Sequence, residues 1–219
     1  MTRAVGVIRV WKRAPRIASA LAGAALLVLS GTALASEPSR SAAFAAARAT
    51  RSGGGRVVLD LDYRAYTWTS LAEARDVCGR AAREADVVIG NGEEMALLGE
   101  DAEHETAADA GGTDGERSSG TGATVDDVKR DDAALAAALH ESGVSLVCIK
   151  AGDAGSRVWP RGGGPLEQPA FAVDVVKPFG AGDAYAAALC AGLLGDEPLG
   201  ATLERAAAAA AIVVASGAC

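Results

Sequence analysis

Residues 171–194 read FAVDVVKPFGAGDAYAAALCAGLL, an apolar run that passes through a turn and glycines into a helix of small residues. The turn falls at residues 177–178, and the tetrapeptide GAGD at positions 180–183 begins the helix. The first amides of a helix lack carbonyl partners and carry the positive end of the helix dipole, and glycine lets a ligand approach the backbone closely. The stretch therefore predicts a site for an anion at the start of this helix.

Asp183 is the residue of this tetrapeptide that an anion site does not explain, because a carboxylate repels an anion. A carboxylate here has a role if it accepts the proton of a hydroxyl that attacks a phosphoryl group. The simpler alternative is an acidic residue in a first helical turn, where the helix dipole favours it. A short glycine motif does not separate these two interpretations.

The composition describes one domain with a full core and a separate acidic segment. The chain has 219 residues, of which 50% are hydrophobic and 4% aromatic, and a net charge of −7. Residues 100–132 carry eleven Asp and Glu against three Lys and Arg, so the negative charge is concentrated there. Residues 100–131 contain almost no large apolar side chain, which predicts a disordered surface insertion. No basic surface for nucleic acid is expected.

The cysteines are far apart in the sequence and lie mostly in apolar surroundings. They are Cys78, Cys148, Cys190 and Cys219, and none belongs to a C-x-x-C motif. We therefore expect reduced, buried thiols, and neither a disulfide framework nor a metal site.

The N-terminal segment has two interpretations that exclude each other. Residues 1–16 carry five basic and no acidic residues, residues 17–35 are apolar, and ALA precedes Ser36, which together fit a secretory signal peptide. Alternatively, residues 24–30 (AALLVLS) form a buried parallel strand that is followed by a turn and a helix. The first interpretation implies an exported protein, and the second implies a cytoplasmic one.

Residues 56–64 (RVVLDLDYR) predict a central strand that becomes polar at its carboxyl end. Ligands of open parallel sheets bind at those ends. Asp60, Asp62 and Arg64 are therefore expected to project toward a possible site. Alternatively, Asp62 and Arg64 only pair with each other at the end of the strand.

Two further motifs follow predicted strands. Asn91 and Glu94 lie where the apolar run 85–90 passes into a helix, and they are either ligand contacts or a helix cap with acidic residues in the first turn. Residues 150–155 (KAGDAG) follow the apolar run 144–149, and alone they would fit a hairpin as well as a loop that passes close to a nucleotide. Between these motifs we expect a helix from about Asp132 to Ser142.

Phe179–Tyr185 (FGAGDAY) resembles the C-terminal signature of the ribokinase-like (PfkB) carbohydrate kinases. The N-x-x-E at 91–94 and the K-x-G-x-x-G at 150–155 also resemble family motifs and occur in the family's order. DLDYR with Trp68 is similar to the D-x-D-Y-R-x-x-x-W of the 5-dehydro-2-deoxygluconokinase branch, although Ala65 stands where that branch has proline.

The resemblance covers residues 20–219 and implies an α/β fold, a ribokinase-like parallel sheet flanked by helices. The lid and most sugar-binding residues of the family lie in an N-terminal third that we expect to be missing here, together with the extreme C-terminus. Residues 1–19 are an unmatched basic extension. Ala207 occupies a position near the nucleotide where relatives have asparagine.

The function that the resemblance implies is ATP-dependent phosphorylation of a sugar acid hydroxyl, with 5-dehydro-2-deoxy-D-gluconate of myo-inositol breakdown as the substrate. It assigns catalysis to Gly180, Ala181, Gly182 and Asp183, and ATP binding to Lys150, Gly152, Gly155, Asn91 and Glu94. Asn91 and Glu94 would also hold Mg²⁺ through water, and Asp62 and Arg64 would contact the sugar acid.

Neither nucleic acid nor a membrane is expected as a partner, and an oligomer is possible although the family's lid interface is missing. One alternative is a catalytically inactive kinase remnant, which the missing lid and Ala207 favour. A second alternative is an exported small-molecule binding protein, which depends on the signal-like N-terminus.

Overall fold

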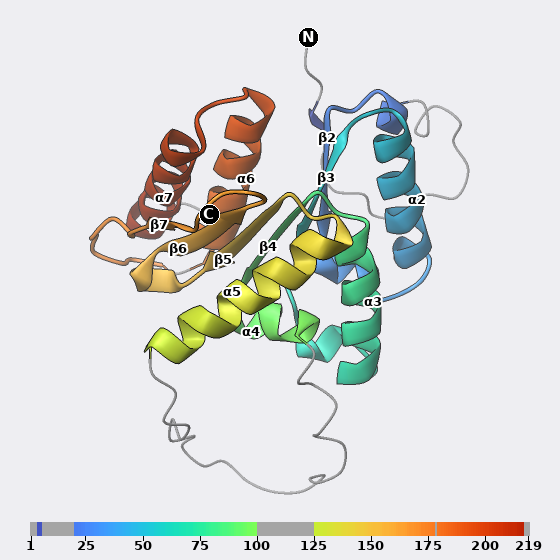
Figure 1. Cartoon of the computed structure of the whole chain (residues 1–219), viewed down its shortest axis with the longest axis horizontal. Coiled ribbons are helices and arrows are strands. Elements are labelled where there is room, and N and C mark those ends of the chain that lie inside the picture. The colour runs from blue at the N-terminus through green and yellow to red at the C-terminus, as the bar shows by residue number, and fades with distance from the viewer. Residues whose placement is uncertain (1–3, 6–19, 100–124, 178, 217–219) are drawn as a thin grey trace, which may run out of the picture.

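The computed structural model describes residues 4–5, 20–99, 125–177 and 179–216. They form a sheet of seven strands in the order β1 to β7, flanked by helices (Figure 1). The strands are β1 (Ala4–Val5), β2 (Leu26–Ser30), β3 (Arg56–Asp60), β4 (Val87–Asn91), β5 (Leu146–Lys150), β6 (Ser156–Pro160) and β7 (Leu166–Gln168).

The first five strands are parallel, and β6 and β7 complete the sheet as antiparallel strands. The α/β prediction is confirmed, and the antiparallel edge has a simple cause. Only residues 151–155 connect β5 to β6, and a parallel connection needs a crossover of a dozen or more residues.

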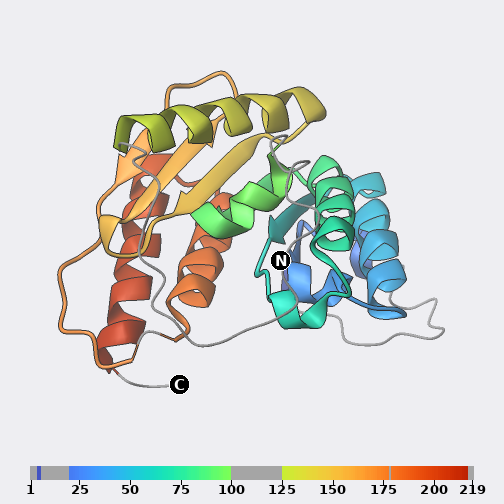
Figure 2. The ribbon, with the colours of Figure 1, turned by 90° about the horizontal axis from the view of Figure 1, so that it is seen from below.

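Helices cover both faces of the sheet (Figure 2). Helices α2, α3 and α5 pack on one face and α6 and α7 on the other, so the sheet is buried between two apolar layers. The helices are α2 (Ser39–Ser52), α3 (Leu71–Arg83), α4 (Gly92–Met95), α5 (Val125–Ser142), α6 (Ala181–Leu194) and α7 (Leu199–Ser216), with 3-10 turns η1 (Gly31–Leu34), η2 (Ala65–Thr67), η3 (Ala96–Leu98) and η5 (Gly152–Ala154).

The strands alternate between the two apolar layers, as the period of two requires. On β3, Val57 and Leu59 pack in the layer of α2, α3 and α5, whereas Val58 packs in the layer of α6 and α7. All three side chains are fully buried. Strands buried on both faces read as continuous apolar runs, which is why these elements were predictable.

Strand β2 agrees with the strand interpretation of residues 24–30. It pairs with β3 in register over its whole length, from Leu26 opposite Arg56 to Ser30 opposite Asp60. A helix follows after η1, at Ser39.

Helix α5 begins seven residues earlier than expected, at Val125 and not near Asp132. Residues 125–131, which the sequence analysis assigned to the disordered insertion, are therefore helical. Their aspartates lie in the first turns of a helix, where the dipole favours acidic side chains. Residues 100–124 of the predicted insertion lie outside the described residues.

Helices α6 and α7 pack closely because small residues separate them. A Cβ atom added at Gly192 of α6 would lie 2.4 Å from the side chain of Thr202 on α7. Among the described helices, α7 is also long and apolar enough to span a membrane, with a mean hydropathy of 1.4. In the structure it lies along α6 and buries Leu203, Ala206 and Ala207.

Packing of α6 on the sheet can be tested with Leu189→Ala. Leu189 is fully buried in the layer of α6 and α7, so we expect the substitution to lower the free energy of unfolding by about 2–5 kcal/mol. Ile212→Ala on α7 is the matched control, because Ile212 is 66% exposed and should change stability by at most about 0.5 kcal/mol. Urea denaturation followed by circular dichroism measures both, and equal effects would contradict this packing.

Candidate active site

Three polar residues end the central strands on the side of α6. Asp60, Asn91 and Lys150 are the last residues of β3, β4 and β5. Each lies two residues after a side chain that packs in the layer of α6 and α7, so each belongs to that same side of the sheet. Carboxyl ends of parallel strands are where open α/β sheets bind ligands.

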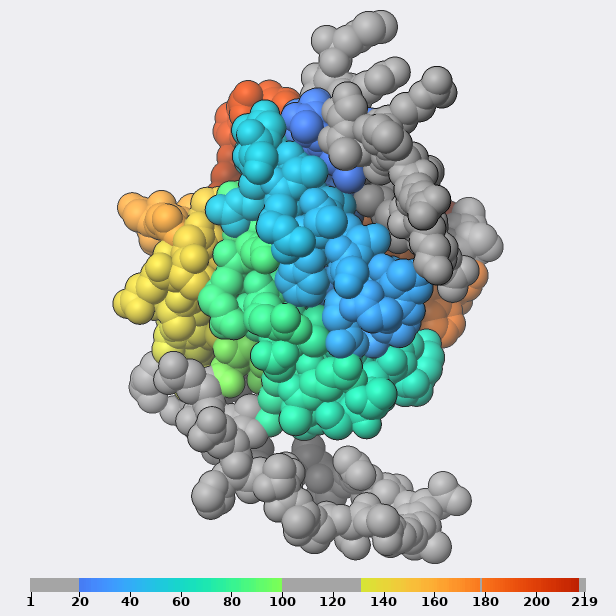
Figure 3. Space-filling model, turned by 90° about the vertical axis from the view of Figure 1, so that its right-hand side faces the viewer, coloured from blue at the N-terminus to red at the C-terminus, as the bar shows by residue number. Residues whose placement is uncertain are grey.

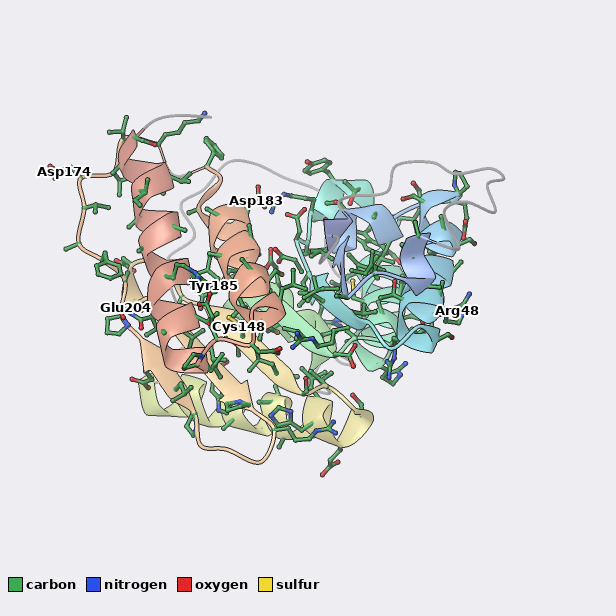
Figure 4. The ribbon with its side chains drawn as sticks, turned by 90° about the horizontal axis from the view of Figure 1, so that it is seen from above. Arg48, Cys148, Asp174, Asp183, Tyr185 and Glu204 are labelled. Atoms are coloured by element: carbon green, nitrogen blue, oxygen red, sulfur yellow. The ribbon has the colours of Figure 1, made fainter. Side chains whose placement is uncertain are left out.

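The α6 start, residues 180–183, lies within reach of the Lys150 side chain at the end of β5. Gly180 precedes the helix with a left-handed φ of 86°, which a glycine adopts without strain. A Cβ atom added at Gly182 would lie 3.4 Å from the Lys150 Nζ atom. Asp183 is exposed and projects from the first turn of α6 on the side away from α7 (Figure 4). The structure thus brings Lys150 and the GAGD motif together.

Lys150 forms an ion pair with Asp60, with 3.1 Å between Nζ and Oδ1. Both side chains are largely buried, with exposed fractions of 19% and 11%. Burial raises the pKa of the Asp60 carboxyl; Lys150 opposes this shift, while the nearby carboxylates of Glu94 and Asp62 add to it. Four charged side chains from three strand ends therefore share one electrostatic environment.

Asn91 and Glu94 form the helix cap that was the simpler of their two interpretations. Asn91 Oδ1 accepts a hydrogen bond from the Glu94 amide at 2.9 Å, and Glu94 Oε2 accepts one from the Asn91 amide at 2.8 Å. This capping box leaves Asn91 Nδ2 and Glu94 Oε1 for other contacts. In the described part of the chain, no three His, Cys, Asp or Glu side chains come together as a metal site. Asn91 and Glu94 therefore belong to no cluster of three such side chains in the described residues, and their role in holding Mg²⁺ through water stays a prediction.

Asp62 and Arg64 pair, as their simpler interpretation predicted. Arg64 Nη2 lies 2.8 Å from Asp62 Oδ1, and the Ser30 hydroxyl donates a hydrogen bond to Asp62 Oδ2 at 3.1 Å. The side chains stay 31% and 51% exposed, so the pair is accessible to a ligand. Asp62 has a φ of 32°, a left-handed conformation that is uncommon outside glycine and that concentrates at functional sites.

A cavity of about 490 Å³ lies beside the turn between β5 and β6. We call it the hairpin cavity, and its size is in the range of ligand pockets. Its lining is almost wholly apolar and comes from the turn, the segment before α6, and helices α6 and α7. The lining residues are Gly152, Asp153, Gly155, Ala170, Phe171, Ala172, Val173, Val175, Ala181, Tyr185, Ala207, Ala210, Ala211 and Val214.

The 150–155 motif forms the turn of the β5–β6 hairpin, which was one of its two interpretations, and Gly152 and Gly155 line this cavity. That the loop passes close to a nucleotide stays a prediction. Gly155 has a φ of 90°, and a Cβ there would lie 2.0 Å from the Gln168 carbonyl oxygen, so only glycine fits. Gly152 has a φ of 59° and open space around it. Ala207 of α7 also lines the cavity.

A buried polar network anchors α6 to the hairpin. The Tyr185 hydroxyl lies 2.7 Å from Ser156 Oγ on β6, and the Cys148 thiol of β5 donates to it at 3.6 Å. Burial raises the pKa of the Cys148 thiol to about 12 and also raises that of Tyr185. Tyr185 follows Asp183 by two positions on α6, and its side chain lies next to Cys148 of β5 (Figure 4). Cys78, Cys148 and Cys190 are buried free thiols, as predicted; Cys219 lies outside the described residues.

A second hollow, of about 550 Å³, lies between α2 and α3, which form the face seen in Figure 3. Three of the four arginines that line it have partners. Arg40 pairs with Glu73, Arg48 with Glu84, and Arg80 lies over the ring of Phe44. We interpret it as a solvated surface between two helices, because none of its lining residues comes from the strand ends or from α6.

The profile of the pfkB family carbohydrate kinases matches residues 9–219 of this chain. The chain belongs to this family. It is 38% identical over 193 residues to 5-dehydro-2-deoxygluconokinase of Geobacillus kaustophilus, which covers 88% of this chain and 50% of that protein. It is 36% identical over 199 residues to the enzyme of the same name from Photobacterium profundum, and this match covers 91% of this chain and 53% of that protein. The chain thus spans about half the length of these pfkB relatives.

Solved structures of kinases share the fold. Aminoimidazole riboside kinase from Salmonella enterica, complexed with aminoimidazole riboside and an ATP analogue, superposes with a TM-score of 0.66 at 24% identity, covering 86% of this chain and 56% of that one. Fructokinase from Vibrio cholerae O395, bound to fructose, ADP and calcium ion, superposes with a TM-score of 0.64 at 25% identity. This superposition covers 86% of this chain and 54% of the fructokinase chain.

The pfkB motifs led to most of the site, and three parts of it were missed. The Asp60–Lys150 pair joins residues 90 positions apart, so it depends on the register of three strands. Of the α7 alanines that line the hairpin cavity, the sequence singled out Ala207, whereas Ala210 and Ala211 carry no chemical signal. Tyr185 follows GAGD and was quoted with it, but its partner Ser156 was not predictable from either motif.

The network below α6 predicts a measurable coupling between Tyr185 and Ser156. Tyr185→Phe and Ser156→Ala should each lower the free energy of unfolding by about 1 kcal/mol, and the double variant should lose less than their sum, because both remove one hydrogen bond. Tyr66→Phe serves as the control, since Tyr66 is 86% exposed. Thermal or urea unfolding of the four variants gives the coupling free energy, and strict additivity would show that this bond does not form.

Proposed function

We propose that the chain carries the phosphoryl-transfer site of a sugar kinase, which moves the γ-phosphoryl group of ATP to a hydroxyl of a sugar acid. The observation that carries this proposal is the convergence of the α6 start, Lys150 and the hairpin cavity at the carboxyl ends of the strands. An anion site, a cation and an apolar cavity are the groups that the phosphates and the base of a nucleotide require.

Asp183 accepts the proton of the sugar hydroxyl in the proposed reaction. The hydroxyl oxygen attacks the γ-phosphorus, a new O–P bond forms, and the bond to the β-phosphate oxygen breaks with its electron pair leaving on ADP. The backbone amides of Gly180, Ala181 and Gly182 stabilise the charge on the transferring group. The exposure of Asp183 fits this role, because its carboxylate is accessible to a hydroxyl from outside the chain.

The base of ATP lies in the hairpin cavity, where Gly152 and Gly155 let the backbone approach the nucleotide. The wall of alanines on α7 offers a flat apolar surface to a ring. Mg²⁺, when bound, neutralises the phosphates during phosphoryl transfer. Asn91 and Glu94 hold the Mg²⁺ ion through water, with side-chain atoms that the capping box does not use.

The proposed substrate is 5-dehydro-2-deoxy-D-gluconate of myo-inositol breakdown, in the cytoplasm, where ATP is available. The names of the curated relatives support this choice. Arg64 is half exposed beside Asp62, and a guanidinium pairs well with the carboxylate of a sugar acid.

The assignment is tested by mixing the chain with Mg²⁺, ATP and 5-dehydro-2-deoxy-D-gluconate and following ADP release. Substrate-dependent release, absent without the sugar acid and weaker with fructose or ribose, is the expected result. Release that does not depend on any sugar, or no release at all, would favour an inactive remnant.

Asp183→Asn should lower turnover by about 100-fold or more, because a general base contributes about 10²–10⁴-fold, while MgATP affinity should stay within about twofold. Asp174→Asn is the matched control, an exposed aspartate on the segment before α6 (Figure 4). Steady-state ADP release and calorimetric titration measure the two quantities. Full turnover in Asp183→Asn would exclude this residue as the base.

A further inference from the structure

Lys150 does not line the hairpin cavity, in which the proposed function places the base of the nucleotide. The residues that line the hairpin cavity include Gly152 and Gly155 of the same motif, but not Lys150. Its ammonium instead lies against Gly182, in the first turn of α6, next to Ala181, which does line the cavity. The glycines of this short motif thus line the cavity, whereas the lysine reaches the helix start at the edge of the cavity.

A positive charge at this place is unfavourable unless an anion is present. The start of a helix carries the positive end of the helix dipole, and cations are normally favoured at the other end. Lys150 is also largely buried, so water does little to reduce the repulsion. In the described structure the Asp60 carboxylate supplies the compensating negative charge, at 3.1 Å.

Asp60 itself sits in an unfavourable environment. Its carboxylate is buried and lies near two further carboxylates, those of Glu94 and Asp62. Lys150 is therefore its main source of stabilisation, and the pair is held at one position between β3 and the α6 start. An ammonium held this way is already oriented when a phosphate reaches the helix start.

We propose that Lys150 contacts the transferred γ-phosphoryl group, and that Asp60 is a positioning residue that holds the ammonium there. This inference rests on the proposed kinase function and specifies which phosphate the lysine recognises. The ammonium neutralises charge on the equatorial oxygens while the O–P bond to the sugar forms and the bond to ADP breaks; it exchanges no proton.

The position can be tested by binding alone. The full chain is titrated in a calorimeter, with Mg²⁺ present, with ADP and with a non-hydrolysable ATP analogue, which differ by the terminal phosphate. Lys150→Met should weaken binding of the ATP analogue by about tenfold to 100-fold and change ADP affinity by no more than about threefold. Lys150→Arg keeps the charge and should keep most of the preference for the analogue.

The double variant Lys150→Met, Asp60→Asn separates this role from a structural one, because it removes both charges and leaves no unpaired carboxylate. We expect it to fold, to bind ADP and to lack the preference for the ATP analogue. Arg205→Met, which removes the surface pair with Glu197, is the control and should change neither affinity.

The inference is overturned if the double variant regains the preference for the analogue, since Lys150 would then only neutralise Asp60. It is also overturned if ADP and the analogue weaken equally, because the lysine would then lie at the other phosphates. If the unaltered chain binds neither nucleotide, the proposed function fails as well, which distinguishes that outcome from the other two.

Discussion

The packing of α6 across the carboxyl ends of β3, β4 and β5 is the contact on which the site depends. Side chains two residues before the strand ends are apolar and pack with the helix, and the last residues are polar, with Lys150 reaching the first turn of α6. Because the strands are parallel and in register, the same alternation that builds the core also places Asp60, Asn91 and Lys150 together. Core and site are thus products of one pattern.

The predictions that succeeded concern local features. Apolar runs mark the buried strands, and glycine followed by Asp183 marks a helix start, because backbone conformation and the helix dipole act within a few residues. The Asn91–Glu94 cap is local too, and its geometry was among the expected alternatives.

The features that escaped prediction depend on distant residues or on weak signals. The partner of Lys150 is set by two strand pairings. Ala210 and Ala211 of α7 line the hairpin cavity, and nothing in their sequence marks them for it. The start of α5 was placed too late because aspartates in residues 125–132 resemble the acidic segment before them. Composition cannot distinguish an acidic loop from an acidic first turn.

The interlocking of α6 and α7 at Gly192 and Thr202 has a consequence for ligand affinity. One helix carries the proposed anion site and the other supplies a wall of the cavity, and the close contact at Gly192 couples their positions. The two surfaces are therefore ordered during folding, and a ligand that spans them does not have to meet that entropy cost on binding. Differences in affinity among such ligands should consequently reflect their contacts and desolvation, with little contribution from rearrangement of the protein.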